Sequence, residues 1–446
     1  LEHTAGFDDM HPRSAYNLHD PPDFPLLEAF KRYPEPFAVR WPPGTIMSYS
    51  NPDYGVAGYL IEKLSGKRFG DYIREAVFTP LGMPHSSLYL TDDVKARLAQ
   101  GYYSIEPLRP APYKEIYYRS SGDLMTSPAE LARLVQMFLN RGQVGGVALF
   151  QPEWILRMEY PQTTLAAQAG LKNGYGLANY VTNIGPWSAH GHNGEIDGFA
   201  ADYRYLPDQG VGYVTLFNSD SLGDAGKEVG RLMMNYLLAG QTARQQAAMP
   251  MSREELSRFA GYYEPQKSRS QLLRFMVEIQ YGNRVTAGSG VLNRKAGLFG
   301  SDETLVPVGN NQFRKVGEQY ASTIFFTTAD GHQIMGDSRG GYSARISPVW
   351  PWTRLGLLIL GGVLMASFVI LALFRFVYML IRWSGSRQGT LVLALPFIAV
   401  LLFLLVARSF MKALELFYGQ RNFATMTVWL GTWIFGVLSI ASLAVG

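Results

Sequence analysis

Tyr49 and Asn51 form a Tyr-x-Asn arrangement whose side chains could do chemistry. A tyrosine phenol near cationic groups can have its pKa lowered and act as a general base, while an amide two residues away can donate to a substrate carbonyl. The triplet alone is weakly specific, because Tyr281-Gly-Asn283 repeats it. Structural alternatives stay open for both residues: Tyr49 as a core side chain, and Asn51, which precedes Pro52, as a helix N-cap.

A second candidate segment is His-Gly-His-Asn-Gly at residues 190–194. Glycines on a strand let a ligand approach the backbone closely. We expect the backbone N–H of Glu195 to form one arm of an oxyanion hole, beside His192 as a donor and with Asn193 and Gly194 in substrate binding. The two histidines could instead bind a metal or be purely structural. The sequence offers no third cluster of ligands, so no metal and no cofactor is expected.

The elements around these residues would place them at the ends of regular structure. Apolar residues at helical spacing follow Asn51-Pro52, which predicts a helix with its N-cap at Asn51 and proline in its first position. Strands are expected over 199–206 and 211–217, joined by a Pro-Asp-Gln-Gly turn. The segment around His192 would therefore lead into a β-hairpin.

Composition along the chain predicts three parts. Residues 1–240 mix helix and strand signals, residues 252–347 read as short strands of a small antiparallel barrel or sandwich, and residues 354–446 read as three transmembrane helices. The third part contains uncharged runs of roughly 20 residues, each long enough to cross a bilayer. These runs are 355–374, 389–407 and 423–446. The two loops between them carry equal positive charge, so the positive-inside rule does not orient them.

Composition also excludes several classes of function. The chain has 40 Lys and Arg against 36 Asp and Glu, a net charge of +4 with no polybasic block, so no nucleic-acid partner is expected. The absence of cysteine excludes disulfides, thiolate metal sites and a cysteine nucleophile. Apolar residues make up 47% of the chain and charged residues 17%, which argues against disorder.

Several blocks in order resemble the serine beta-lactamase-like family, which includes class C beta-lactamases, DD-carboxypeptidases and related esterases. The resemblance covers roughly residues 1–238. The matching blocks are Leu1-Glu-His-Thr-Ala-Gly-Phe7, the segment from Pro43 to Gly66, Phe78-Thr-Pro-Leu-Gly-Met83, Ser121-Gly-Asp-Leu-Met-Thr-Ser127, and His192-Asn-Gly194 in the place of the family's Lys-Thr-Gly or His-x-Gly motif.

The resemblance implies an α+β fold, in which an antiparallel sheet lies beside a helical lobe and the active site lies at their junction. It also implies acyl-enzyme chemistry on a peptidoglycan-type D-amino-acid peptide, a beta-lactam or an ester. Tyr49 would help to move protons, Asn51 would orient the substrate amide, and His192 would stand where the family has Lys or His.

The family's Ser-x-x-Lys nucleophile motif is missing from its expected place upstream of the first block. Its one occurrence, Ser409-Phe-Met-Lys412, follows the other motifs and is interpreted as coincidence. Because the chain starts at Leu1 inside the family pattern, we expect an N-terminally truncated protein whose nucleophile lies in a leading segment. The alternative is a non-catalytic, membrane-tethered binding or sensor pseudoenzyme.

The expected partners are the membrane bilayer and a small-molecule or peptidoglycan-like substrate, and the sequence does not predict the oligomeric state. The family's substrates indicate a multi-pass protein of the cytoplasmic membrane, whose soluble domains face the periplasm or the cell exterior.

Overall fold

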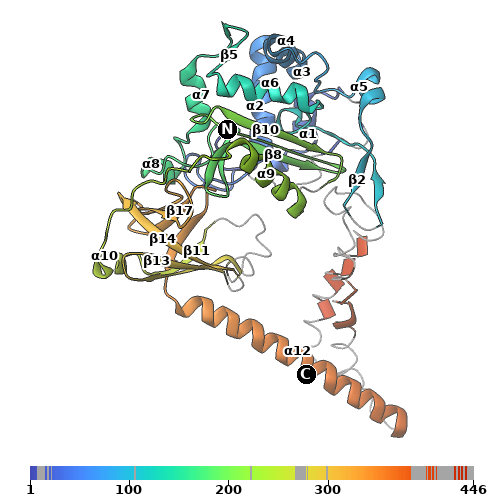
Figure 1. Ribbon diagram of the computed structural model, residues 1–446. Helices are drawn as coiled ribbons and strands as arrows, with labels where there is room; N and C mark the ends of the chain where they lie inside the picture. The colour runs from blue at the N-terminus through green and yellow to red at the C-terminus, as the bar shows by residue number, and fades with distance from the viewer. Residues whose placement is uncertain are drawn as a thin grey trace. The chain divides into compact units, whose positions relative to one another are not determined.

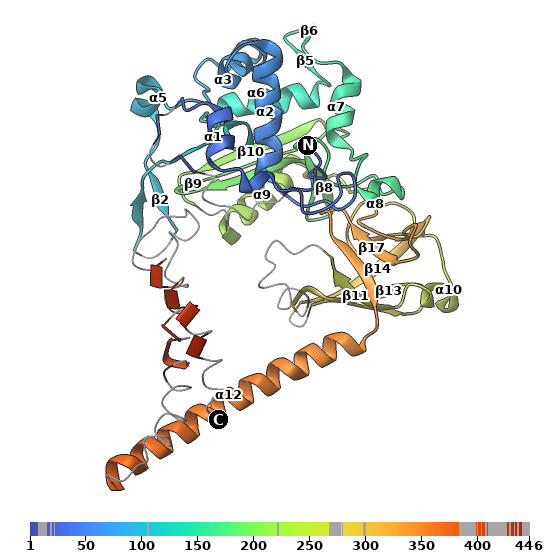
Figure 2. The same ribbon diagram turned by 180° about the vertical axis from the view of Figure 1, so that it is seen from behind.

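The computed structural model describes residues 1–7, 16–17, 20–21, 23–104, 107–220, 223–266, 278, 280–297, 300–382 and scattered positions from 398 to 438. The chain divides into two compact units, one ending at Pro348 and the other beginning at Val349. The first unit contains a four-stranded antiparallel sheet with helices, followed by a closed barrel (Figure 1). Figure 2 shows the same arrangement from behind.

The four-stranded sheet has the strand order β10-β9-β8-β7, and all its neighbours are antiparallel. Its strands are β7 (Tyr180–Ile184), β8 (Trp187–Ile196), β9 (Phe199–Leu206) and β10 (Val211–Phe217). The predicted hairpin over 199–217 is confirmed. Strand β7 begins at Tyr180, opposite Gly191 of β8, and His192 lies opposite Tyr203 of β9. Beyond Gly191, β8 is therefore paired with β9 alone among the described strands.

Helices α6 (Pro128–Leu139) and α9 (Gly223–Leu237) cover opposite faces of this sheet. Successive side chains on a strand point to opposite faces, and β9 shows this alternation. Tyr205 stacks on Phe138 of α6 at 5.1 Å between ring centroids, whereas Leu206 packs with Met234 of α9. The apolar stripe of each helix is buried against the sheet, which fixes the strands that carry the candidate site.

Helix α2 (Asn51–Ser65) is the predicted helix, but it begins one residue earlier than predicted, with its N-cap at Ser50. The hydroxyl of Ser50 accepts a hydrogen bond from the backbone N–H of Asp53 at 3.3 Å. Ser50 has the extended backbone of a cap, whereas Asn51 is already the first helical residue. The prediction of Asn51 as the N-cap is therefore wrong, because serine at the preceding position caps the helix.

The remaining elements of the first region are short and connect these larger ones. They are β1 (Tyr16–Asn17), α1 (Leu26–Arg32), η2 (Glu35–Phe37), α3 (Phe69–Ile73), η3 (Arg74–Phe78), α4 (Thr79–Leu81), α5 (Asp92–Arg97), β2 (Gly101–Tyr103), β3 (Arg109–Ala111), β4 (Glu115–Ile116), η4 (Arg119–Ser121), β5 (Gln143–Val144), β6 (Val147–Ala148), α7 (Pro152–Glu159) and α8 (Leu165–Gln168).

The second region is a closed antiparallel barrel, which resolves the predicted choice between barrel and sandwich. Its interior is filled by apolar side chains, including Phe313, Phe325 and Tyr263, so it is a packed core. Helix α10 (Arg253–Ser257) precedes it, and a capping box caps the N-terminus of this helix. The strands are β11 (Gly261–Pro265), β12 (Asn283–Ala287), β13 (Leu292–Ala296), β14 (Asp302–Gly309), β15 (Gln312–Lys315), β16 (Thr323–Thr327), β17 (Gln333–Asp337) and β18 (Tyr342–Ile346).

The barrel contacts the sheet region directly. The amide of Asn173 donates to the carbonyl of Ala321 at 3.1 Å, and the backbone N–H of Ser188 donates to the side chain of Gln319 at 2.8 Å. Leu171 from the sheet region packs with the barrel residue Ile324. These polar and apolar contacts join the two regions within the first unit.

The second unit begins with α12 (Val349–Arg382), which includes the first predicted membrane span. The long uncharged run does form one helix, as its composition predicts. Within the described part of the chain, however, we find no helix with the length and apolar character of a bilayer span. The prediction of three transmembrane helices is therefore not supported. The runs 389–407 and 423–446 fall largely outside the described residues.

The predicted fold class is thus confirmed for the antiparallel sheet with its helices and for the all-β domain that follows. The transmembrane region is the part of that prediction which the structure does not support.

Candidate active site

The predicted residues of β8 line a large cavity on the first unit. The cavity measures about 800 Å³, which is within the usual size range of small-molecule sites. His192, Asn193, Gly194 and Glu195 all belong to its wall. Most of the remaining wall is apolar and comes from the strands and from residues 122–134. Four of the six predicted site residues are therefore brought together along one strand.

His192 is held by a hydrogen bond to a tyrosine that the sequence analysis did not select. Nε2 of His192 lies 2.6 Å from the phenol oxygen of Tyr175, and Nδ1 contacts the backbone carbonyl of Asn193. Burial raises the pKa of the Tyr175 phenol far above its ordinary value, so the phenol stays protonated. Burial lowers the pKa of His192 to about 4, so the imidazole is neutral near pH 7.

These protonation states assign the tautomer of His192. The carbonyl of Asn193 can only accept, so Nδ1 carries the proton and donates to it. Nε2 is then the acceptor for the Tyr175 O–H. In the structure His192 is therefore a neutral imidazole with both nitrogens engaged, and it is oriented from both sides.

A second chain of contacts holds Asn193. The phenol of Tyr180 donates to the side-chain oxygen of Asn193, and the guanidinium of Arg204 donates to the Tyr180 oxygen at 2.7 Å. Arg204 is buried, and it is balanced by the carboxylate of Asp202 at 2.8 Å. A buried charge with a close partner is stable in place, whereas removal of the partner would be costly. The amide of Asn193 is therefore anchored to a fixed ion pair.

Tyr49 belongs to a neighbouring cluster of rings. Its ring centroid lies 4.3 Å from that of His3 and 6.2 Å from that of Tyr175. His3 is buried, and its Nδ1 accepts a hydrogen bond from the backbone N–H of Ser50 at 3.0 Å. Burial lowers the pKa of His3, which favours its neutral form. Tyr175 contacts both Tyr49 and His192, so it connects the ring cluster to the β8 residues.

Asn51 is half-buried at the first turn of α2 and does not belong to the wall of the large cavity. Tyr49, two residues before the helix, is also half-buried and outside that wall. The predicted site therefore falls into two groups, the β8 residues along the cavity and the pair at the start of α2. The two groups are connected by ring contacts from Tyr49 to His3 and from His3 to Tyr175, and by the hydrogen bond between Tyr175 and His192.

The backbone direction at Glu195 follows from that at Gly191. The N–H of Gly191 donates to the side chain of Asn179 at 2.9 Å, on the side of β8 that faces β7. Backbone N–H groups alternate between the two sides of a strand, so those of Asn193 and Glu195 point the same way. At Asn193 and Glu195 strand β7 no longer runs alongside β8, because β7 begins at Tyr180, opposite Gly191. The alternation therefore directs the N–H of Glu195 toward the edge of β8 that β7 leaves open.

Gly191 and Gly194 serve different purposes. A Cβ at Gly191 would lie 2.0 Å from the carbonyl oxygen of Tyr203, and its φ of +147° is unfavourable for other residues. A Cβ at Gly194 would meet nothing within 4 Å. The expectation that both glycines admit a ligand is wrong for Gly191, because the close approach there is to the neighbouring strand β9.

Several residues of the site were missed by sequence reasoning: His3, Tyr175, Tyr180 and Arg204. The sequence does carry a local signal for Tyr175, since it stands between two glycines in Gly174-Tyr-Gly176. No comparable signal marks Tyr180 or Arg204, which reach Asn193 through strand pairing.

No group of three or more metal-binding side chains occurs within the residues that the structure describes. Ser409 and Lys412, the one Ser-x-x-Lys of the sequence, lie outside those residues.

The family model for beta-lactamase matches residues 1–237. The chain is 32% identical to the putative beta-lactamase-like 1 of Homo sapiens over 186 residues, which cover 39% of this chain and 34% of that protein. It is 27% identical to penicillin-binding protein 4 of Amycolatopsis lactamdurans over 40% of this chain and 48% of that protein. The chain therefore spans less than half the length of these curated relatives.

Among solved structures, the chain resembles the octameric penicillin-binding protein homologue from Pyrococcus abyssi. The TM-score is 0.44 at 20% identity, over 77% of this chain and 76% of that one. The D-amino acid amidase from Ochrobactrum anthropi gives a TM-score of 0.44 at 19% identity, over 53% of this chain and 70% of that one.

Proposed function

The chain belongs to the beta-lactamase family, and we propose that it is part of a serine hydrolase that works through an acyl-enzyme. The substrate would be a peptidoglycan-type D-amino-acid peptide, a beta-lactam or an ester. One observation carries the proposal: a single strand, β8, aligns His192, Asn193 and the N–H of Glu195 along a cavity of about 800 Å³. The family relationship favours catalysis over the alternative of a non-catalytic sensor.

In this scheme a serine hydroxyl attacks the substrate carbonyl and forms a tetrahedral intermediate. The serine proton passes to a base, and the leaving group takes up a proton as the C–N or C–O bond breaks. Water then hydrolyses the ester that joins the acyl group to the serine. We do not assign the nucleophile to any of these 446 residues, because the family's Ser-x-x-Lys is not found at its expected place.

The residues of this chain would bind the substrate and support the charge that develops. The N–H of Glu195 would donate to the oxyanion, and Asn51 would orient the substrate amide. Tyr49 would help to transfer the proton. Burial keeps His192 neutral, and its contacts with Tyr175 and Asn193 hold it in a single tautomer, so it would act as a fixed hydrogen-bonding group of the cavity wall.

Tyr49→Phe tests the proposed proton transfer. In the protein expressed from its natural gene, we expect turnover of the best substrate to fall roughly 10²-fold to 10⁴-fold, which is the usual contribution of a general acid or base. The fold should be retained, because only a hydroxyl is removed. The matched control is Tyr236→Phe at a strongly exposed position. Unchanged turnover in Tyr49→Phe would remove this tyrosine from the mechanism.

We also propose that the catalytic region works outside the cytoplasm, at the cytoplasmic membrane, because peptidoglycan-type substrates are found there. The membrane location depends on the apolar runs 389–407 and 423–446, which the structure largely leaves undescribed. Cell fractionation followed by protease treatment of intact spheroplasts would test it. Recovery of the protein in the cytoplasmic fraction, protected from protease, would contradict this location.

A further inference from the structure

We propose that a second cavity, between the sheet region and the barrel, binds a small zwitterion of the size of an amino acid or dipeptide. We call it the interdomain cavity. Its volume of about 280 Å³ is close to the lower end of the usual range for small-molecule pockets, roughly 300 Å³. Its wall consists of Asn173, Val181, Thr182, Asn183, Arg294, Glu303, Lys315, Glu318, Tyr320, Ser322, Thr323, Asp337, Ser338 and Arg339.

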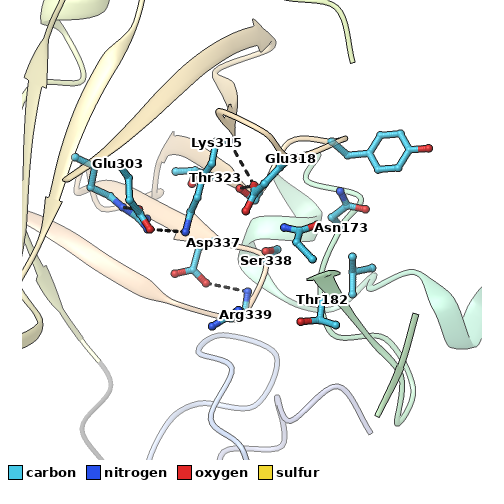
Figure 3. Close-up of a pocket in the computed structure, with 14 residues that line it drawn as sticks. Asn173, Thr182, Glu303, Lys315, Glu318, Thr323, Asp337, Ser338 and Arg339 are labelled. Carbon is cyan, nitrogen blue, oxygen red and sulfur yellow. Dashed lines mark hydrogen bonds and ion pairs between the residues drawn. The ribbon is translucent and has the colours of Figure 1, made fainter. Parts of the chain in front are cut away.

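The two sides of the interdomain cavity differ in character. Its six charged residues all come from the barrel, whereas the sheet region contributes Asn173 and strand β7 (Figure 3). Three of the six are positive and three are negative. A ligand with one charge would meet as many like charges as opposite ones. A ligand with both charges can satisfy both kinds of side chain.

Part of this charge is already compensated within the protein. Glu303 accepts from Lys315 Nζ at 2.6 Å and from Arg294 Nε at 2.6 Å, so this group of three keeps one net positive charge. Arg339 makes no ion pair among the described residues. It supplies a second uncompensated positive charge to the wall.

Two carboxylates lack a cationic partner among the described residues. Asp337 accepts from the backbone N–H groups of Arg339 and Gly341, at 2.9 and 2.7 Å. Glu318 accepts from the hydroxyl of Ser322 and the backbone N–H of Lys315. The uncompensated charge of the wall is therefore two positive and two negative, which complements a carboxylate and an ammonium group in one molecule.

Thr323 gives an independent sign of an unfilled polar site. It belongs to the cavity wall and is fully buried, and its hydroxyl has no hydrogen-bond partner within the described structure. A buried hydroxyl without a partner costs about 1–3 kcal/mol. A polar ligand would remove that cost, whereas an apolar occupant would not.

Two segments that line the interdomain cavity also carry residues that hold the candidate active site. Asn173 is two residues before Tyr175, which bonds His192, and Val181 follows Tyr180, which bonds Asn193. A ligand here would therefore touch both segments that position the β8 residues. The proposal itself concerns binding and does not depend on the proposed hydrolase function.

Isothermal titration calorimetry of the full chain tests the proposal. The probes are D-alanine, L-alanine and alanyl-alanine, with propionate and ethylammonium as analogues that carry one charge each. We expect at least one zwitterion to bind about tenfold or more tighter than either analogue. The highest ligand concentration would be about 10 mM, which still detects weak binding. Absence of binding by all three zwitterions at that concentration would overturn the proposal. Equal binding of a single-charge analogue would also overturn it.

Two variants locate the binding. Arg339→Gln removes an exposed guanidinium and should weaken zwitterion binding about fivefold or more. Thr323→Val should also weaken it, and without ligand this variant should be at least as stable as the parent chain, because an unpartnered hydroxyl is lost. Thr327→Val, at the exposed end of the same strand β16, is the control and should bind normally. Unchanged affinity in both Arg339→Gln and Thr323→Val would place the ligand elsewhere and refute the site.

Discussion

At the scale of single residues, the Tyr175 phenol donates to His192 across 2.6 Å. In Tyr175→Phe the Nε2 of His192 loses its partner in a buried position, so we expect a loss of about 1–3 kcal/mol in the free energy of unfolding. The hydrogen bond favours the neutral imidazole, so its removal should raise the pKa of His192 from about 4. Urea unfolding and NMR titration of the histidines measure the two effects.

Tyr236→Phe is the control for this change, because Tyr236 is 84% exposed. It should leave both stability and the His192 titration unchanged. If Tyr175→Phe behaved like this control, the proposed orientation of His192 would be wrong.

Two buried histidines should make stability depend on pH. Burial lowers the pKa of His190 and His192 from 6.5 to about 4 in the folded state. As pH falls, the unfolded chain binds these protons first, so stability is complete above pH 6.5 and is lost between 6.5 and 4. Each histidine should contribute roughly 3 kcal/mol to this loss.

The comparison of His190→Asn with the parent chain isolates one histidine. We expect the gap in unfolding free energy between pH 7 and pH 4 to shrink by roughly 3 kcal/mol in the variant. The variant is needed because burial raises the pKa of Asp123 to about 7, an effect of opposite sign in the same range. An identical pH profile in both proteins would show that His190 titrates normally in the folded state.

Sequence reasoning at this scale found residues that sit in recognisable motifs, and missed their partners. His192 and Asn193 stand in a short glycine-flanked segment, which can be read locally. Tyr180 and Arg204 act on Asn193 only because β7 and β9 flank β8. Such contacts depend on strand register, which a single sequence does not determine.

At the scale of elements, strand β8 needs glycine at one position for its own packing. Gly191→Ala places a Cβ 2.0 Å from the Tyr203 carbonyl at a positive φ, so we expect a loss of at least about 2 kcal/mol. Gly194→Ala meets open space and should change stability by less than about 0.5 kcal/mol. Thermal unfolding of both variants measures the difference. Equal stability of the two would contradict the register of β8 against β9.

The elements themselves were predicted well where their pattern is local. The helix from Asn51 and the hairpin over 199–217 formed as expected, because apolar spacing and turn residues determine them. The cap of α2 shifted to Ser50, since both Ser50 and Asn51 are good capping residues and the backbone decides between them. Closure of the barrel depends on pairing of β11 with β18, the most distant strands, and no local pattern reveals it.

At the scale of the whole molecule, the first unit joins a beta-lactamase-family region to a packed barrel through direct hydrogen bonds and apolar contacts. The sequence distinguished these regions by composition, but it could not show that they share an interface with a charged cavity. That cavity lies beside the same segments, 173–175 and 180–182, that hold the candidate active site.

Acylation of a serine tests the central claim most directly. The protein expressed from its natural gene would be treated with benzylpenicillin and, separately, with a fluorophosphonate, and examined by intact mass and peptide mapping. Acyl-enzyme chemistry predicts a stoichiometric adduct on one serine with at least one reagent, and none after heat denaturation. Hydrolysis of substrate by a natural-gene product that forms no adduct with either reagent would contradict the account.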